Sequence, residues 1–127
     1  MPTVDYVIRY VDDLERGVAF YRDLLGLEHR LTDNGYAEFA AGPTKLALME
    51  RARAAEMLGR DLPGGGGDGE ILFLVEDVDA EAARLRDAGV EVVAGPEDRP
   101  WGHRTLHVLD PQGHLVELAQ EIERADR

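Results

Sequence analysis

The chain has 127 residues, 26 Asp and Glu against 14 Lys and Arg, and no cysteine, so its formal charge at neutral pH is −12. This length fits one domain that can bury a core without disulfides, and the missing cysteines exclude thiolate nucleophiles and Cys-ligated metals. The acidic balance argues against binding to nucleic acid or to an anionic membrane. Because no signal-like or membrane-length apolar segment is present, the sequence predicts a cytoplasmic protein.

A faint internal repeat relates residues 10–23 to residues 74–87 at a constant offset of 64. Both segments read as the end of a strand followed by an acidic cap and a helix. The identical pairs are Val11/Val75, Asp13/Asp77, Ala19/Ala83, Arg22/Arg86 and Asp23/Asp87. A repeat of this kind predicts two copies of one structural unit.

The first copy begins with an expected strand over residues 4–11, rich in β-branched and aromatic side chains. Asp12 or Asp13 can cap the helix that follows, which we expect to run to about Leu25 and to stop at Gly26. Three further strands are expected over residues 27–31, 35–40 and 44–50, separated by turn residues.

Residues 51–69 form the expected connector, with a short helix in their first part and a flexible glycine-rich stretch at 63–69. The second copy then repeats the pattern with strands at 71–75, 90–94, 103–109 and 114–120, and a loop over 96–102. The sequence therefore predicts one α+β domain spanning 1–127. Its two βαβββ modules in tandem, about 3–50 and 70–120, form curved mixed sheets around a concave cavity.

Strand alternation predicts which side chains face that cavity. A three-residue loop over 111–113, with glycine in the left-handed position, would pair Asp110 with His114. Counting back along the hairpin, His107 pairs with Glu117, and both lie on the face opposite the helix. In the first strand of the same module, Glu70 faces inward with Leu72 and Leu74.

The offset of 64 places Tyr6, Ile8 and Tyr10 at the equivalent inward positions of the first module. This register puts Arg9 in the row that faces the helix. Either the Arg9 side chain extends to the rim of the sheet or the first strand contains a bulge. Aligning residues 45–48 with 115–118 makes Ala47 the counterpart of Glu117.

Several segments resemble the vicinal oxygen chelate superfamily, which includes glyoxalase I, extradiol dioxygenases, fosfomycin-resistance thiol transferases and bleomycin-resistance proteins. The first copy contributes VDDLER (11–16) followed by FYRDLLGL (20–27). The second contributes FLVEDVD (73–79), GVEV (89–92), PWGHR (100–104) and DPQGHLVEL (110–118). The resemblance covers nearly the whole chain. Within the superfamily, the sequence most resembles the bleomycin-resistance branch.

The resemblance also implies where metal ligands would lie. Metalloenzymes of the family place His, Gln or Glu at positions that here hold Tyr6, Ala47, Glu70 and Glu117. Because a phenol is a poor ligand and Ala is none, we expect no tightly held metal or other cofactor. The alternative is a divalent Zn, Mn, Ni or Fe ion held by Glu70, His107 and Glu117.

The candidate site residues can also have purely structural roles. Glu117 and His107 can form a purely structural pair, because a buried carboxylate requires a partner, and Glu70 can lie in water. Trp101 can stack on a flat ligand at the cavity mouth or merely cover the end of the sheet. We expect His103 and His114 to be exposed.

Two functions follow from these observations. The first is a metal-free homodimer that binds an amphipathic small molecule, such as an antibiotic that it sequesters, through Tyr6, Tyr10, Glu70, Trp101, His107 and Glu117. The second is a metal-dependent lyase, isomerase, dioxygenase or thiol transferase. The sequence leaves open whether the modules pair within one chain or across a dimer.

Overall fold

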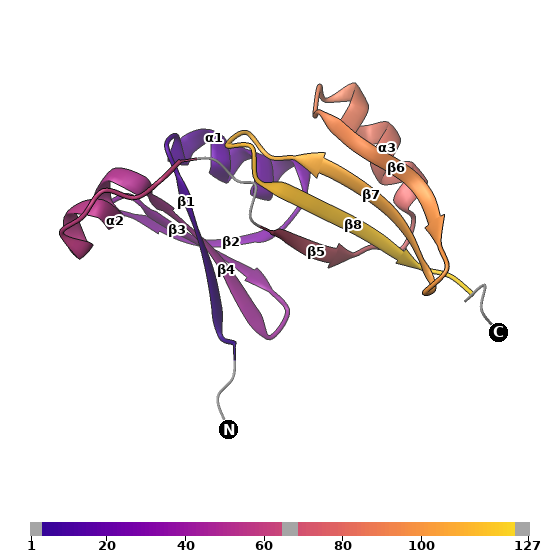
Figure 1. The fold of residues 1–127 in the computed structure, drawn as a ribbon, viewed down its shortest axis with the longest axis horizontal. Helices are drawn as coiled ribbons and strands as arrows, with labels where there is room; N and C mark the ends of the chain where they lie inside the picture. Colours follow the sequence, from indigo (N-terminus) through magenta and orange to yellow (C-terminus); the bar gives the residue numbers. More distant parts are fainter. Residues whose placement is uncertain (1–3, 65–68, 124–127) are drawn as a thin grey trace. The chain divides into compact units, whose positions relative to one another are not determined.

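The computed structural model describes residues 4–64 and 69–123, and the chain divides into two compact units, Met1–Gly64 and Gly65–Arg127 (Figure 1). Residues 65–68 of the expected glycine-rich connector lie outside the described residues. Each unit is described by itself below.

Unit 1 contains one four-stranded mixed sheet with the strand order β1-β4-β3-β2. The first and last strands in sequence, β1 and β4, run parallel, and the other neighbours are antiparallel. The elements are β1 (Tyr6–Val11), α1 (Leu14–Ala19), the π-helix η1 (Phe20–Leu24), β2 (Glu28–Asp33), β3 (Tyr36–Ala41), β4 (Thr44–Glu50) and α2 (Arg51–Leu58).

Unit 2 repeats this topology in a second sheet with the order β5-β8-β7-β6. Here β5 and β8 are the parallel pair. The elements are β5 (Glu70–Leu74), α3 (Val78–Asp87), β6 (Val92–Arg99), β7 (His103–Leu109) and β8 (Leu115–Glu121). The expected α+β fold of two tandem βαβββ modules is confirmed.

Each module helix begins at the predicted kind of aspartate cap. The carboxylate of Asp13 accepts a hydrogen bond from the Arg16 backbone N–H at 3.1 Å, and Asp77 does the same for Ala80. The first helix differs from expectation in its second half. After Ala19 the backbone widens into the π-helix η1, in which the Leu25 N–H donates to the Phe20 carbonyl oxygen.

The core of each unit lies between its helix and one face of its sheet. In unit 1 the buried Tyr21 packs edge-on against Phe20, with ring centroids 5.0 Å apart, and also contacts Phe39. In unit 2 the helix buries Val78, Ala82 and Leu85. The buried residues Leu106, Val108, Val116 and Leu118 form the facing row of the sheet.

The strand expected at 90–94 is longer than predicted, because β6 continues to Arg99 through residues that read as a loop. Its register with β7 shifts twice, between Val92 and Ala94 and between Ala94 and Glu97. Gly95 lies in the second shift with φ +92°, and a Cβ there would lie 2.2 Å from the Thr105 carbonyl oxygen. Glycine therefore allows the strand to pass this point.

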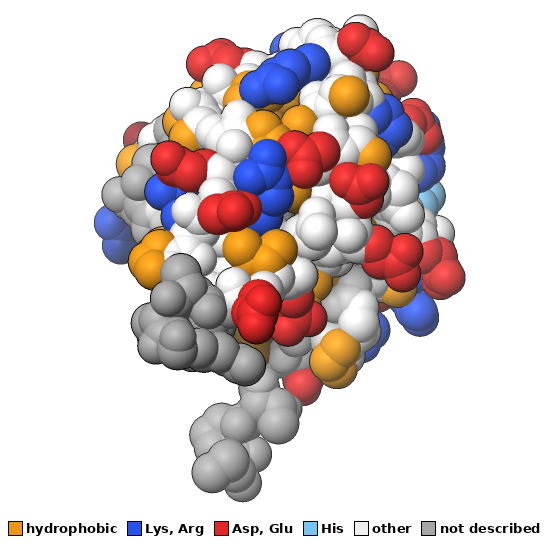
Figure 2. Space-filling view, turned by 90° about the vertical axis from the view of Figure 1, so that its right-hand side faces the viewer, with side chains coloured by type: hydrophobic (Ala, Val, Ile, Leu, Met, Phe, Trp, Pro, Cys, Tyr) orange, Lys and Arg blue, Asp and Glu red, His pale blue; other side chains and the backbone are white. Residues whose placement is uncertain are grey.

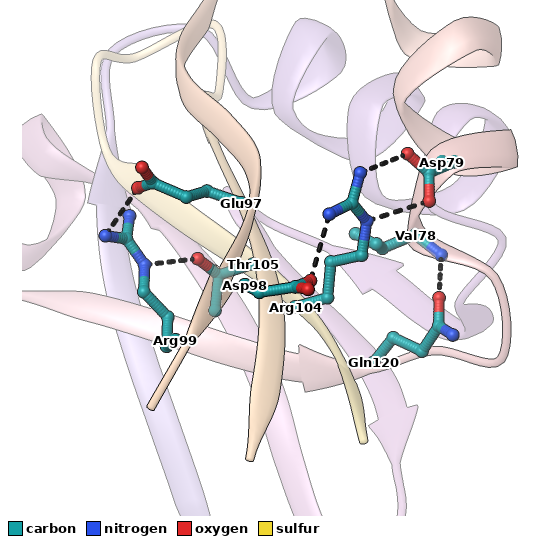
Figure 3. A network of polar contacts seen from close by, with 8 residues as sticks. All are labelled: Val78, Asp79, Glu97, Asp98, Arg99, Arg104, Thr105 and Gln120. Carbon is teal, nitrogen blue, oxygen red and sulfur yellow. Dashed lines mark hydrogen bonds and ion pairs between the residues drawn. The ribbon is translucent and has the colours of Figure 1, made fainter. Parts of the chain in front are cut away.

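Polar contacts also join α3 to the outer face of its sheet (Figure 3). The Arg104 guanidinium on β7 donates to both carboxylate oxygens of Asp79, each at 2.9 Å, and to Asp98 on β6. This contact lowers the pKa of Asp79 below its ordinary value. The Gln120 side-chain oxygen accepts a hydrogen bond from the Val78 N–H at the start of α3.

On the face drawn in Figure 2, acidic and basic side chains are interspersed with apolar ones. Among the described residues, no helix has the length and apolar character needed to cross a membrane.

Candidate functional site

The strand register of unit 2 brings three polar side chains to the sheet face opposite α3. His107 on β7 pairs directly with Glu117 on β8, as the hairpin predicted. The turn has the expected form, because Gly113 has φ +87° and the Asp110 N–H donates to the His114 carbonyl oxygen. Glu70 starts β5 on the same face, two residues before Leu72, which pairs with Glu117.

These three side chains converge on a small volume. The Nε2 atom of His107 lies 3.4 Å from Oε1 of Glu117 and 3.5 Å from Oε1 of Glu70. One ligand-type atom from each residue lies within 4.8 Å of the others. The Glu117 side chain is 9% exposed and Glu70 is 37% exposed, so the cluster has a buried and an open end.

The pKa values of the two carboxyl groups are shifted in opposite directions. Burial raises the pKa of Glu117 to about 7, and the neighbouring Glu70 carboxylate adds to this rise. The pKa of Glu70 is lowered, chiefly because it hydrogen-bonds with Glu117. Glu117 therefore keeps its proton to a higher pH than Glu70 does.

Apolar side chains and a cation surround this cluster on the same face. Leu72 lies beside Glu117 in the register, and Leu72 and Leu74 are 41% and 59% exposed. Arg99 on β6 donates to the Thr105 hydroxyl at 3.0 Å, and Figure 3 shows it on the side of the sheet away from Arg104. Sequence reasoning missed Arg99 because its segment read as a loop.

Unit 1 carries a buried carboxylate at the equivalent place, which sequence reasoning also missed. Glu38 on β3 pairs with Ala47, as His107 pairs with Glu117. It accepts a hydrogen bond from the Tyr36 hydroxyl at 2.9 Å and lies 3.3 Å from the Arg30 guanidinium. Burial, together with Glu38, raises the pKa of Tyr36 to about 12.

Of the other predicted site residues, Tyr6 and Tyr10 belong to unit 1 and Trp101 belongs to unit 2. Tyr6 and Tyr10 lie on β1 of unit 1 and share the face that carries Ala47. The Lys45 ammonium lies 5.0 Å from the Tyr6 ring centroid. Trp101 is 55% exposed in the turn between β6 and β7. This turn leads directly into His103, the first residue of β7. His103 lies four positions, or about 13 Å, along β7 from His107.

The structure answers the question that the sequence left open about the register of β1 around Arg9. The register between β1 and β4 is continuous, so β1 contains no bulge, and Arg9 lies half-buried beside Leu48 in the helix-facing row.

The expectation that His114 is exposed is wrong. It is 8% exposed, and its backbone N–H donates to the Asp110 carboxylate at 2.8 Å.

The donor set of the cluster fits a divalent ion. Two carboxylates and an imidazole suit Zn, Mn, Ni or Fe, and their ligand atoms already lie close together. Glu117 would have to lose its proton, because a carboxylate binds metal in its deprotonated form. Glu70, His107 and Glu117 would hold such an ion, with further coordination positions left for substrate or water.

Comparison with known proteins agrees with this architecture. The profile of the Glyoxalase/Bleomycin resistance protein/Dioxygenase superfamily matches residues 3–118. The chain belongs to this superfamily. The uncharacterised protein YraH of Bacillus subtilis is 36% identical over 115 residues, covering 85% of this chain and 90% of its own length.

Two further relatives differ in what their names describe. A probable lactoylglutathione lyase of Synechocystis is 31% identical over 124 residues, covering 91% of this chain and 93% of its own. The crystal structure of TnmS3, an antibiotic-binding protein from Streptomyces, has a TM-score of 0.75 and 27% identity, covering 95% of this chain and 97% of its own. Membership of the superfamily therefore spans both an enzyme and a binding protein.

Proposed function

We propose that the chain binds an amphipathic small molecule, such as an antibiotic, at the inner face of unit 2, the sheet face opposite α3. The observation that carries this proposal is the position of Leu72 directly beside Glu117. An exposed apolar side chain thus adjoins the polar cluster of Glu70, His107 and Glu117. A ligand pocket uses such a combination for affinity and orientation.

The side chains of this face define what such a ligand would look like. An amine or another hydrogen-bond donor suits the Glu70 carboxylate, which is the exposed and ionised member of the pair. A planar or apolar body suits Leu72, which is open to solvent. Planar cationic antibiotics of the bleomycin type combine these two properties. Tyr6, Tyr10 and Trp101 remain proposed ligand contacts.

Calorimetric titration of metal-stripped protein with bleomycin and other planar cationic compounds tests the proposal. We expect saturable binding at a single site, weakened by Leu72→Ser and by Glu70→Gln. Glu56→Gln, on the exposed surface of α2, is the matched control and should bind like the unaltered chain. Binding that is equal in all four proteins, or absent from the whole panel, would overturn the proposal.

A second candidate function rests on the approach of three ligand atoms within 4.8 Å. In this case the chain is a metal-dependent lyase, isomerase, dioxygenase or thiol transferase. A bound divalent ion would polarise paired oxygens of the substrate. Glu70, His107 and Glu117 would hold it.

Metal analysis after purification without chelators separates the two candidates. About one equivalent of Zn, Mn, Ni or Fe per chain, lost in His107→Ala and retained in Glu56→Gln, would establish the metal site. Ligand binding that survives chelation and shows no metal dependence would favour the binding protein.

A further inference from the structure

The outer face of unit 1 contains a cavity that the proposed function does not use. Its volume is about 530 Å³, within the range of pockets that hold small molecules. The lining residues are Leu14, Glu15, Val18, Arg22, His29, Thr32 and Glu50. They come from α1, η1, β2 and the end of β4, all within one unit.

The two modules differ in how their helices cover their sheets. In unit 2 the ten-residue α3 packs against β6, β7 and β8. In unit 1 the six-residue α1 makes its main contacts with β3 and β4 before the chain enters η1. The cavity lies between α1 and the edge strand β2, which is the equivalent of β6.

The strand register shows that a polar residue replaces an apolar one at this place. His29 pairs with Phe39, as Val92 pairs with Val108 in the other module. The His29 Nε2 atom lies 2.6 Å from the Thr32 hydroxyl, and its ring lies 5.5 Å from that of Phe39. A helix-facing position that is aliphatic in one module is therefore polar and borders a cavity in the other.

The charged groups of the cavity favour a cation. Glu15 and Glu50 contribute two carboxylates. The single guanidinium, that of Arg22, is already neutralised by Asp23, which accepts from its Nε and Nη2 atoms at 2.8 and 3.0 Å. Leu14 and Val18 add apolar wall. An anionic rim on apolar walls attracts positively charged organic molecules.

From these observations we infer that unit 1 has a second ligand site, on its outer face between α1 and β2, for a small organic cation with an ammonium group on an apolar or aromatic body. Glu15 and Glu50 bind the ammonium group, the Leu14 and Val18 side chains contact the body, and the His29 and Thr32 pair forms the polar end. This site is independent of the inner face of unit 2.

Three probes of similar size and different charge test the inference on the full chain. They are 2-phenylethylamine, the neutral 2-phenylethanol and the anionic 3-phenylpropionate. In ¹H–¹⁵N and imidazole NMR spectra we expect the amine to shift the amides of Leu14 to Val18 and the ring signals of His29 in a saturable way. The alcohol should bind more weakly, and the carboxylate should bind weakest.

The variants Glu15→Gln and Glu50→Gln are each expected to raise the dissociation constant of the amine about threefold, as loss of one exposed ion pair does. Neither should alter alcohol binding. The matched control is Glu28→Gln, because Glu28 lies on the same strand with its side chain on the opposite face from His29. This variant should bind the amine like the unaltered chain.

Three results would overturn the inference: equal shifts with the amine and the carboxylate, equal weakening by Glu28→Gln, or no shift at the cavity residues. Shifts confined to the neighbourhood of His107 and Glu117 would assign the amine to the inner face of unit 2. That outcome would reject the second site and leave the proposed function standing. Loss of ligand binding at the inner face alone would leave the second site unaffected.

Discussion

Carboxylate oxygens of Glu70 and Glu117 lie within 4.8 Å of each other across the parallel strands β5 and β8. The pKa of the buried Glu117 is raised, whereas that of the more exposed Glu70 is lowered. The arrangement depends on the depth of the two side chains, because water stabilises the ionised form of Glu70 and is kept from Glu117. His107 faces both carboxyl groups through one nitrogen atom. The pair is consequently sensitive to pH near neutrality.

Replacing Glu117 by Gln should change how stability depends on pH. The folded pKa of Glu117, about 7, exceeds its ordinary value of 4.5, so the stability that protonated Glu117 contributes is complete below pH 4.5 and is lost as the pH rises through 7. The Gln variant lacks this loss. Between pH 5 and pH 8 we expect its free energy of unfolding to rise, relative to that of the unaltered chain, by on the order of 1–2 kcal/mol.

Urea unfolding at a series of pH values measures this difference. The contribution of Glu70 has the opposite pH dependence. Because its pKa is lowered, it adds stability at pH values above its ordinary pKa, and this stability is lost at more acidic pH. The Glu70→Gln variant should therefore diverge from the unaltered chain below about pH 4.5. A constant difference between Glu117→Gln and the unaltered chain across the range would refute the raised pKa of Glu117.

Substituting Gly95 by Ala should destabilise unit 2 far more than substituting Gly89. Both glycines have positive φ, +92° and +82°, so both substitutions carry the left-handed backbone penalty of about 1–2 kcal/mol. Only at Gly95 would the new Cβ lie 2.2 Å from a backbone oxygen, while at Gly89 nothing lies within 4 Å. We expect a loss of about 3 kcal/mol or more for Gly95→Ala.

Denaturant unfolding of both variants checks this expectation, with Gly89→Ala as the control for backbone strain. If both substitutions reduce the free energy of unfolding equally, the close approach of β6 to β7 at Gly95 is wrong.

Trp101→Ala should leave stability within about 0.5 kcal/mol of the unaltered chain, because more than half of the side chain is exposed. If Trp101 contacts the ligand, the substitution should weaken binding of a planar ligand by about tenfold, the upper range of aromatic stacking. The only tryptophan in the chain also supplies the readout, since a ligand that stacks on it quenches its fluorescence.

The outcome decides between the two interpretations of this residue. Unchanged affinity measured by calorimetry, together with unchanged stability, would leave Trp101 outside the binding site. A large loss of stability would instead support its role in covering the end of the sheet.

The fold and the centre of the site could be predicted because both depend on local rules. The repeat predicted the two modules, and the geometry of one short hairpin placed His107 opposite Glu117. The π-helix η1 could not be predicted, because helical periodicity in the sequence tolerates one widened turn.

Two residues, Arg99 and Glu38, were not predicted for other reasons. Arg99 was missed because glycine followed by proline normally ends a strand, whereas β6 passes this point with a shift in register. Glu38 was missed because only the first and last strands of the two modules were aligned. Aligning the third strands as well would have matched it with His107, since both residues pair with the equivalent positions Ala47 and Glu117.

The last prediction is that the chain forms a homodimer. The edge strands β1 and β5 both present exposed apolar side chains on the face opposite the module helix, with Ile8 and Leu74 each more than 40% exposed. Apolar edge strands of this kind are normally covered by another chain or element. Light scattering should therefore give twice the chain mass of 14.0 kDa at micromolar concentration.

Charged substitutions then test which surface is covered. Leu74→Lys should shift the equilibrium toward the monomer, because it places a charge in the apolar contact. Met57→Lys is the matched control, since Met57 is 64% exposed on α2 and lies outside these strands. A monomeric mass for the unaltered chain contradicts the dimer, and equal dissociation by both substitutions contradicts its placement on the edge strands.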